Sequence, residues 1–151
     1  MSTVGRIVER IGRIGADPTD DEDQRRRKRY LAASAVLVLP AGIVWGLLYL
    51  ATGERVAAAI PIGYSVLSSA SLVAFARWHD FRAFRAFQLL FILLLPFLLQ
   101  VALGGFVPAS AVILWSLLCP FGALIFADVR SAARWFALFA LLVVVSPFVG
   151  T

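Results

Sequence analysis

The sequence predicts an all-α fold: an integral membrane bundle of about five transmembrane helices behind a polar N-terminal segment. Hydrophobic residues make up 61% of the 151 residues and charged residues 15%, with a mean hydropathy of +0.88. Soluble domains are about half apolar and a quarter charged. Eight of the fourteen basic residues and six of the nine acidic residues precede Tyr30, so the remaining chain is nearly free of charge. A soluble fold cannot keep that much apolar surface out of water.

Residues 1–29 form the polar N-terminal domain, and its first half has the spacing of an amphipathic helix. The apolar side chains that share one helical face are Val4, Ile7, Val8, Ile11 and Ile14. This pattern is typical of a short helix on a membrane surface. An unstructured tail is the alternative, because Gly5, Gly12 and Gly15 each weaken a helix by about 1 kcal/mol.

The second half of this domain is a run of acids followed by the basic cluster Arg25, Arg26, Arg27, Lys28 and Arg29. Because the cluster directly precedes an apolar stretch, we expect it to anchor the topology, each cation gaining about 1 kcal/mol beside anionic lipid. The lipid bilayer and anionic lipids are therefore the expected partners. Nucleic acid is not, since no DNA- or RNA-binding module accompanies the cluster.

Charges and glycines divide residues 30–151, the transmembrane domain, into five apolar spans. Their expected limits are 30–51, 56–76, 84–103, 107–127 and 132–149. Each is close to the roughly 20 residues that cross about 30 Å of hydrocarbon. With a cytoplasmic N-terminus, thirteen of the fourteen basic residues lie inside, as expected for a multi-pass protein of the cell (inner) membrane. Five spans leave the C-terminus outside, so we expect a sixth span to be missing.

The residue types exclude several kinds of chemistry. One cysteine, Cys119, and one histidine, His79, exclude an internal disulfide, a thiolate cluster and paired imidazole ligands within a single chain. No catalytic, cofactor-binding or metal-binding motif is present. We therefore expect that the chain as given is not an enzyme and uses no cofactor.

Polar residues within the spans are the remaining candidates, because apolar surroundings make them costly. Gln88 and Gln100 are each expected to hydrogen-bond a neighbouring helix, with ligand binding as the alternative. The expected lining of a small ligand site at the outer end of the spans is Gln100, Gly104, Gly105, Ser110 and Ser116. A small apolar or membrane-borne molecule is the expected ligand.

The second span is rich in small residues, which let helices approach closely. Those expected at helix contacts are Gly63, Ser65, Ser68 and Ser69. Close contact through such a face also predicts that the chain associates with a second copy as a homodimer.

Several short segments between residues 43 and 139 carry a family resemblance. They are 45–49, 53–54, 60–65, 88–96, 103–107, 110–116, 120–124 and 134–136, together with Gln100. The region resembles the membrane domain that precedes the catalytic domain of bacterial class III adenylate/guanylate cyclases. In that family six helices precede a cytoplasmic cyclase domain that works as a dimer and binds metal through aspartates. The sequence has neither the sixth helix nor that domain, so the resemblance implies no catalytic residue here.

Three functions stay open at this point. The first, which the resemblance implies, is the membrane-anchoring and sensor or regulatory module of a bacterial adenylate/guanylate cyclase signalling protein, without its catalytic domain. The second is a small transporter or channel subunit, against which the lack of ionisable residues in the middle of the spans argues. The third is a structural membrane anchor that binds no ligand.

The loop charges predict on which side of the membrane each connection lies. Reporter fusions or cysteine labelling are expected to place residues 80 and 130 in the cytoplasm and residues 54 and 105 outside, because basic loops stay inside. Labelling of a cysteine at position 105 only from the cytoplasm would overturn this arrangement.

Overall fold

The computed structural model describes residues 3–105, 109 and 112–149, without the side chains of Val4 and Val8. Within these ranges every regular element is a helix, which confirms the all-α class. The α-helices are α1 (Thr3–Gly12), α2 (Glu22–Ala51), α3 (Arg55–Trp78), α4 (Phe81–Ala102), α5 (Leu118–Phe126) and α6 (Val129–Val145). Two 3-10 helices are η1 (Val112–Leu117) and η2 (Ser146–Phe148).

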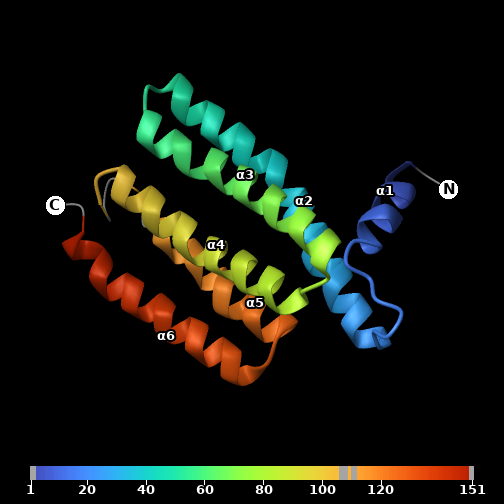
Figure 1. The fold of residues 1–151 in the computed structure, drawn as a ribbon. Coiled ribbons are helices and arrows are strands. Elements are labelled where there is room, and N and C mark those ends of the chain that lie inside the picture. The colour runs from blue at the N-terminus through green and yellow to red at the C-terminus, as the bar shows by residue number, and fades with distance from the viewer. Residues whose placement is uncertain (1–2, 106–108, 110–111, 150–151) are drawn as a thin grey trace.

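Helices α2 to α6 lie side by side in alternating directions, and α4 lies at the centre (Figure 1). α4 contacts α3 on one side and η1 and α5 on the other, while α6 packs on α5. Among the described residues, four helices are long and apolar enough to cross a membrane: α2, α3, α4 and the combined stretch Val129–Phe148. The fifth apolar stretch among the described residues, Val112–Phe126, is shorter.

This shorter stretch lies within the fourth predicted span, 107–127, whose limits stay a prediction. It consists of η1 followed by α5 and is not one regular α-helix. Pro120 lies in the first turn of α5 and has no N–H to donate to the carbonyl of Ser116 in η1. A 3-10 helix rises about 2.0 Å per residue and an α-helix about 1.5 Å, so the two together reach roughly 25 Å.

Three aspartates begin the three helices that start at the same end of the bundle. The carboxylates of Asp21, Asp80 and Asp128 accept hydrogen bonds from the backbone N–H of Gln24, Ala83 and Ser131, at 2.7, 3.0 and 2.8 Å. These are N-caps, which satisfy donors that have no partner within the helix. We call this end, with residues 13–21, 79–80 and 127–128, the polar end.

The capped helices begin before the predicted apolar spans. α2 begins at Glu22, ahead of the span 30–51, α4 at Phe81, ahead of 84–103, and α6 at Val129, ahead of 132–149. The span limits themselves stay predictions. In α2 the additional turns are supported by ion pairs one turn apart, Glu22 with Arg26 and Asp23 with Arg27. The basic cluster 25–29 is therefore part of the first long helix.

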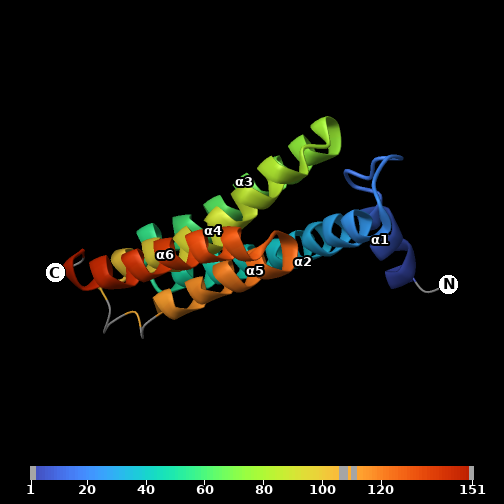
Figure 2. The ribbon, with the colours of Figure 1, turned by 90° about the horizontal axis from the view of Figure 1, so that it is seen from below.

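The N-terminal segment folds against the polar end of the bundle (Figures 1 and 2). α1 is helical, as its periodicity predicted, and the unstructured tail is excluded for these residues. Ile11 and Ile14 pack against a buried cluster made of Leu31, Ala32, Ala35, Leu72, Phe75 and Phe84. Gly15 has a φ of 69° and lies against the Phe75 ring, which any Cβ at this position would overlap. A surface position on a membrane stays a prediction for α1.

α2 and α3 approach closely at two glycines of α2 that lie one helical turn apart. A Cβ on Gly42 would overlap the hydroxyl of Ser65, and one on Gly46 would overlap the side chain of Ile62. Backbone carbonyls of α3 also lie within 3.1 Å of both positions. This is the G-x-x-x-G arrangement, in which small residues let two helix backbones come together.

Substitution of these glycines tests the close approach. Gly42→Ala and Gly46→Ala are each expected to lower the free energy of unfolding by about 1–3 kcal/mol, because the added methyl group forces the helices apart. Gly63→Ala is the matched control, since this glycine is also inside a helix but its Cβ would meet no atom within 4 Å. The control is expected to gain up to about 1 kcal/mol from helix propensity.

Unfolding of the detergent-solubilised chain in increasing dodecyl sulfate, followed by circular dichroism, measures all three variants. Equal effects at Gly42, Gly46 and Gly63 would show that α2 and α3 do not depend on these glycines for their contact.

Candidate functional site

Gln88 joins α3 to α4 within the bundle. Its side-chain amide donates hydrogen bonds to the hydroxyls of Ser68 and Ser71, both at 3.0 Å. Gln88 and Ser68 are almost completely buried, at 2% and 0% exposure. The expectation that Gln88 bonds a neighbouring helix is confirmed, and its polar atoms are occupied by the fold itself.

Gln100 lies on the same helix and has no such partner. Its side chain is 0% exposed, and within the described part of the chain neither its amide nitrogen nor its amide oxygen makes a hydrogen bond. Within the described residues, the expected bond from Gln100 to a neighbouring helix is therefore not made. Ser146 in η2 is likewise 0% exposed with an unbonded hydroxyl. Because η2 packs against α4, both groups belong to the end of the bundle opposite the polar end.

The other residues of the predicted ligand site are placed as follows. Gly104 and Gly105 have φ values of 90° and 106° and form the turn that ends α4, and Gly105 is buried. The hydroxyl of Ser116 donates to the carbonyl of Leu93 at 2.8 Å, so it is already used between η1 and α4. Ser110 lies outside the described residues. Among the described members of this set, Gln100 is therefore the residue whose side-chain amide has no partner in the described part of the chain.

The predicted helix-contact residues of α3 divide into two pairs. Ser65 donates to the carbonyl of Leu39 in α2 at 3.0 Å, and Ser68 is part of the Gln88 contact. Gly63 faces open space, and Ser69 is exposed and bonds the carbonyl of Ser65 in its own helix. Ser65 and Ser68 thus act within the chain, while a contact between two copies stays a prediction.

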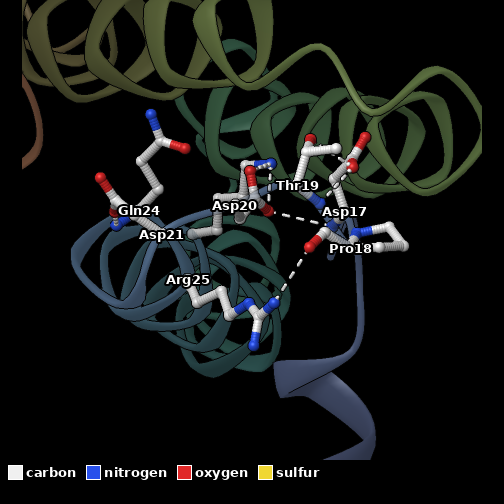
Figure 3. A network of polar contacts seen from close by, with 8 residues as sticks. Asp17, Pro18, Thr19, Asp20, Asp21, Gln24 and Arg25 are labelled. Carbon is white, nitrogen blue, oxygen red and sulfur yellow. Dashed lines mark hydrogen bonds and ion pairs between the residues drawn. The ribbon is translucent and has the colours of Figure 1, made fainter.

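The side chains of the basic cluster 25–29 have different surroundings, and its role as a topology anchor stays a prediction. Lys28 is buried and donates to both carboxylate oxygens of Asp20 at 2.7 Å, with side chains only 9% and 8% exposed. Asp20 also accepts from the backbone N–H of Asp17 at 2.9 Å, in a turn whose other bonds are shown in Figure 3. Arg25, Arg26 and Arg29 are exposed. The cluster therefore contains one structural cation and three that face the surroundings.

Arg27 and Arg85 stabilise the end of α5. Arg27 donates to the carbonyl of Ala127 and Arg85 to that of Phe126, both at 2.8 Å. The last carbonyls of a helix lack partners within it, and cations there are favourable. Both arginines border a cleft of about 590 Å³ between the first turns of α2 and residues 79–85. The bonds of Arg27 and Arg85 to the end of α5 were not predicted from the sequence. Nor was the helix contact at Gly42 and Gly46, although the four-residue spacing of these glycines indicates such a contact.

In residues 3–105, 109 and 112–149, no three His, Cys, Asp or Glu side chains lie together in a way that could hold a metal ion. Comparisons of the chain with protein-family models, with curated proteins and with solved structures each found no match.

The Asp20–Lys28 pair predicts how stability depends on pH. Burial raises the pKa of Asp20, but the hydrogen bonds from Lys28 and from the Asp17 N–H outweigh it, and the pKa lies below its ordinary value of 3.8. A carboxyl with a lowered folded pKa contributes stability above its unfolded pKa and loses it as the pH falls through the folded pKa. The unfolding temperature is therefore expected to fall as the pH is lowered below about 4.

Two variants separate this pair from the other carboxylates. Asp20→Asn is expected to lower the unfolding temperature at neutral pH, because Lys28 is then buried without a counter-charge. In acid, where Asp20 of the parent is itself protonated, the unfolding temperatures of the variant and the parent are expected to converge. The double variant Asp20→Asn/Lys28→Met leaves no unpaired charge and is expected to be more stable at neutral pH than Asp20→Asn. Thermal unfolding followed by circular dichroism measures this, and identical pH profiles for parent and Asp20→Asn would contradict it.

Proposed function

We propose that the chain is a multi-pass module of the cell (inner) membrane with a cytoplasmic N-terminus, and that it acts as a sensor or regulatory module of a signalling protein. Exposed apolar side chains on all four long helices support the membrane part. One large example from each of α2, α3, α4 and α6 is Leu37, Val66, Phe87 and Val144, which are 76%, 63%, 51% and 65% exposed. Apolar surface of this extent is stable when lipid surrounds it.

The proposed topology has five spans. Val112–Phe126 supplies the fifth, because its reach of roughly 25 Å approaches the thickness of the hydrocarbon layer. The N-terminal segment and the loops next to Arg77, Arg82, Arg85 and Arg130 all lie at the polar end. This concentration of cations at one end supports a cytoplasmic position for that end.

The surroundings of Gln100 favour a sensor over a plain anchor. A buried polar group without a partner lowers stability by about 1–3 kcal/mol. This loss of stability serves no purpose in a plain anchor, whereas a ligand could bond the amide in a sensor. Gln88 shows that the same helix bonds an amide when the amide serves packing alone. A membrane-borne ligand that hydrogen-bonds Gln100 in one helix packing and not in another would shift the balance between the two. The resemblance to class III cyclases supports a cyclase as the output.

A chimeric cyclase tests this function with two matched variants. The chain replaces the first five helices of a class III cyclase, which keeps its own sixth helix and catalytic domain in the cytoplasm. Cyclic AMP output is measured in vesicles with and without an added extract of apolar membrane compounds. Gln100→Leu is expected to abolish the response to the extract while leaving stability unchanged or higher, because it removes an unbonded amide.

Gln88→Leu is the control. It is expected to lower the free energy of unfolding by about 1 kcal/mol, because Ser68 and Ser71 lose their partner, and to retain a response in the folded fraction. A parent chimera whose output never changes, or a Gln100→Leu variant that responds like the parent, would favour the anchor without a ligand.

A further inference from the structure

A small basic pocket lies between the end of α1 and the first turns of α2. Its volume is about 300 Å³. Gly12 and Ala16 form one wall, and the other wall is formed by Glu22, Arg25, Arg26, Lys28 and Arg29. Four cations therefore face the pocket with one acid among them. Lys28 is neutralised by Asp20, which leaves the three arginines as the source of its positive potential.

The three arginines retain most of their hydrogen-bond donors. Arg25 makes a single bond of 3.3 Å to the carbonyl of Pro18, and Arg26 lies 3.8 Å from an exposed Glu22. Arg29 lies over the ring of Tyr30, with 5.6 Å between guanidinium carbon and ring centre. Each guanidinium has five N–H donors, so few of the fifteen are used by these contacts. At Gly12, an added Cβ would lie 2.9 Å from Cδ of Arg29, so glycine leaves room for that side chain along the wall.

We propose that this pocket binds the phosphate of an anionic phospholipid headgroup. Guanidinium groups match phosphate oxygens in geometry and donate two hydrogen bonds at once. The pocket is formed only where the N-terminal segment meets α2, so a headgroup there contacts both. The inference rests on the membrane insertion proposed above and does not depend on a sensor role or on Gln100.

The outer face of α2 points to a lipid as the source of the phosphate. Arg26 and Leu37 are eleven positions apart, which is about 20° of helix rotation and about 16 Å along the axis. Val44, a further seven positions on, lies on the same face. Tyr30, Leu37 and Val44 are 55%, 76% and 54% exposed. A phospholipid held at the arginines therefore has an apolar stripe along which its acyl chains lie, whereas free phosphate would use none of it.

Lipid binding by the full chain in a neutral detergent tests the proposal. The probe is a short-chain phosphatidylglycerol, compared with a short-chain phosphatidylcholine and with inorganic phosphate, and bound lipid is measured by native mass spectrometry. The pocket variant replaces Arg25, Arg26 and Arg29 with Gln. The matched control replaces Arg6, Arg10 and Arg13 with Gln, because these exposed arginines of the same segment remove the same charge away from the pocket.

The pocket variant is expected to bind phosphatidylglycerol about a hundredfold more weakly than the parent, from the sum of three arginine contacts. The control is expected to lose less than about threefold, since distant charges are screened. Gly12→Leu fills the pocket without changing its charge, and is expected to weaken binding about tenfold even if the triple variant fails to fold.

Three results would overturn the proposal. Equal losses of phosphatidylglycerol affinity in the two triple variants would show that binding depends on the net charge of the N-terminal segment and not on the pocket. Unchanged binding by Gly12→Leu would show that the lipid does not occupy the pocket. Equal binding of inorganic phosphate, or of phosphatidylcholine, would show that the site does not select an anionic lipid.

Discussion

The close approach of α2 to α3 at Gly42 and Gly46 is the contact from which the rest of the bundle follows. Beyond Arg29, apolar side chains cover α2 on every side, so hydrophobicity does not select the face that meets a neighbour, and small residues do. Once the two helices meet there, Ser65 reaches the backbone of α2. An adjoining face of α3, about 60° further around the helix at Ser68, presents Ser68 and Ser71 to Gln88, and this hydrogen-bonded contact joins α3 to α4, the helix on which η1 and α5 pack.

At the polar end, a small set of charged residues stabilises the helix ends. Three aspartates cap the helices that begin there, two arginines bond the end of α5, and the Asp20–Lys28 pair ties residues 13–21 to α2. In apolar surroundings every backbone donor and acceptor at a helix end needs such a partner. The same charges bias the orientation of a membrane protein, so stability and topology depend on one set of residues.

The two glutamines of α4 are chemically identical and have opposite surroundings. Gln88 is bonded within the fold, and Gln100 is buried without a partner within the described residues. About 120° of helix rotation separates them, so they face different neighbours. A single helix therefore contains a polar contact that serves packing and a polar group that packing leaves unused. That contrast, and not hydropathy, distinguishes a proposed sensor from a passive anchor.

The sequence by itself determined the helical class, the approximate limits of α2, α3, α4 and α6, and the gathering of charge at one end. These follow from composition, because a long apolar segment satisfies its backbone hydrogen bonds most simply as a helix. Only the tertiary structure decided which helices are neighbours, why Lys28 is buried while Arg25, Arg26 and Arg29 are exposed, and that Gln100 has no partner among the described residues. Whether a side chain finds a partner depends on its direction around the helix and on what packs there, and neither is set by the residue type alone.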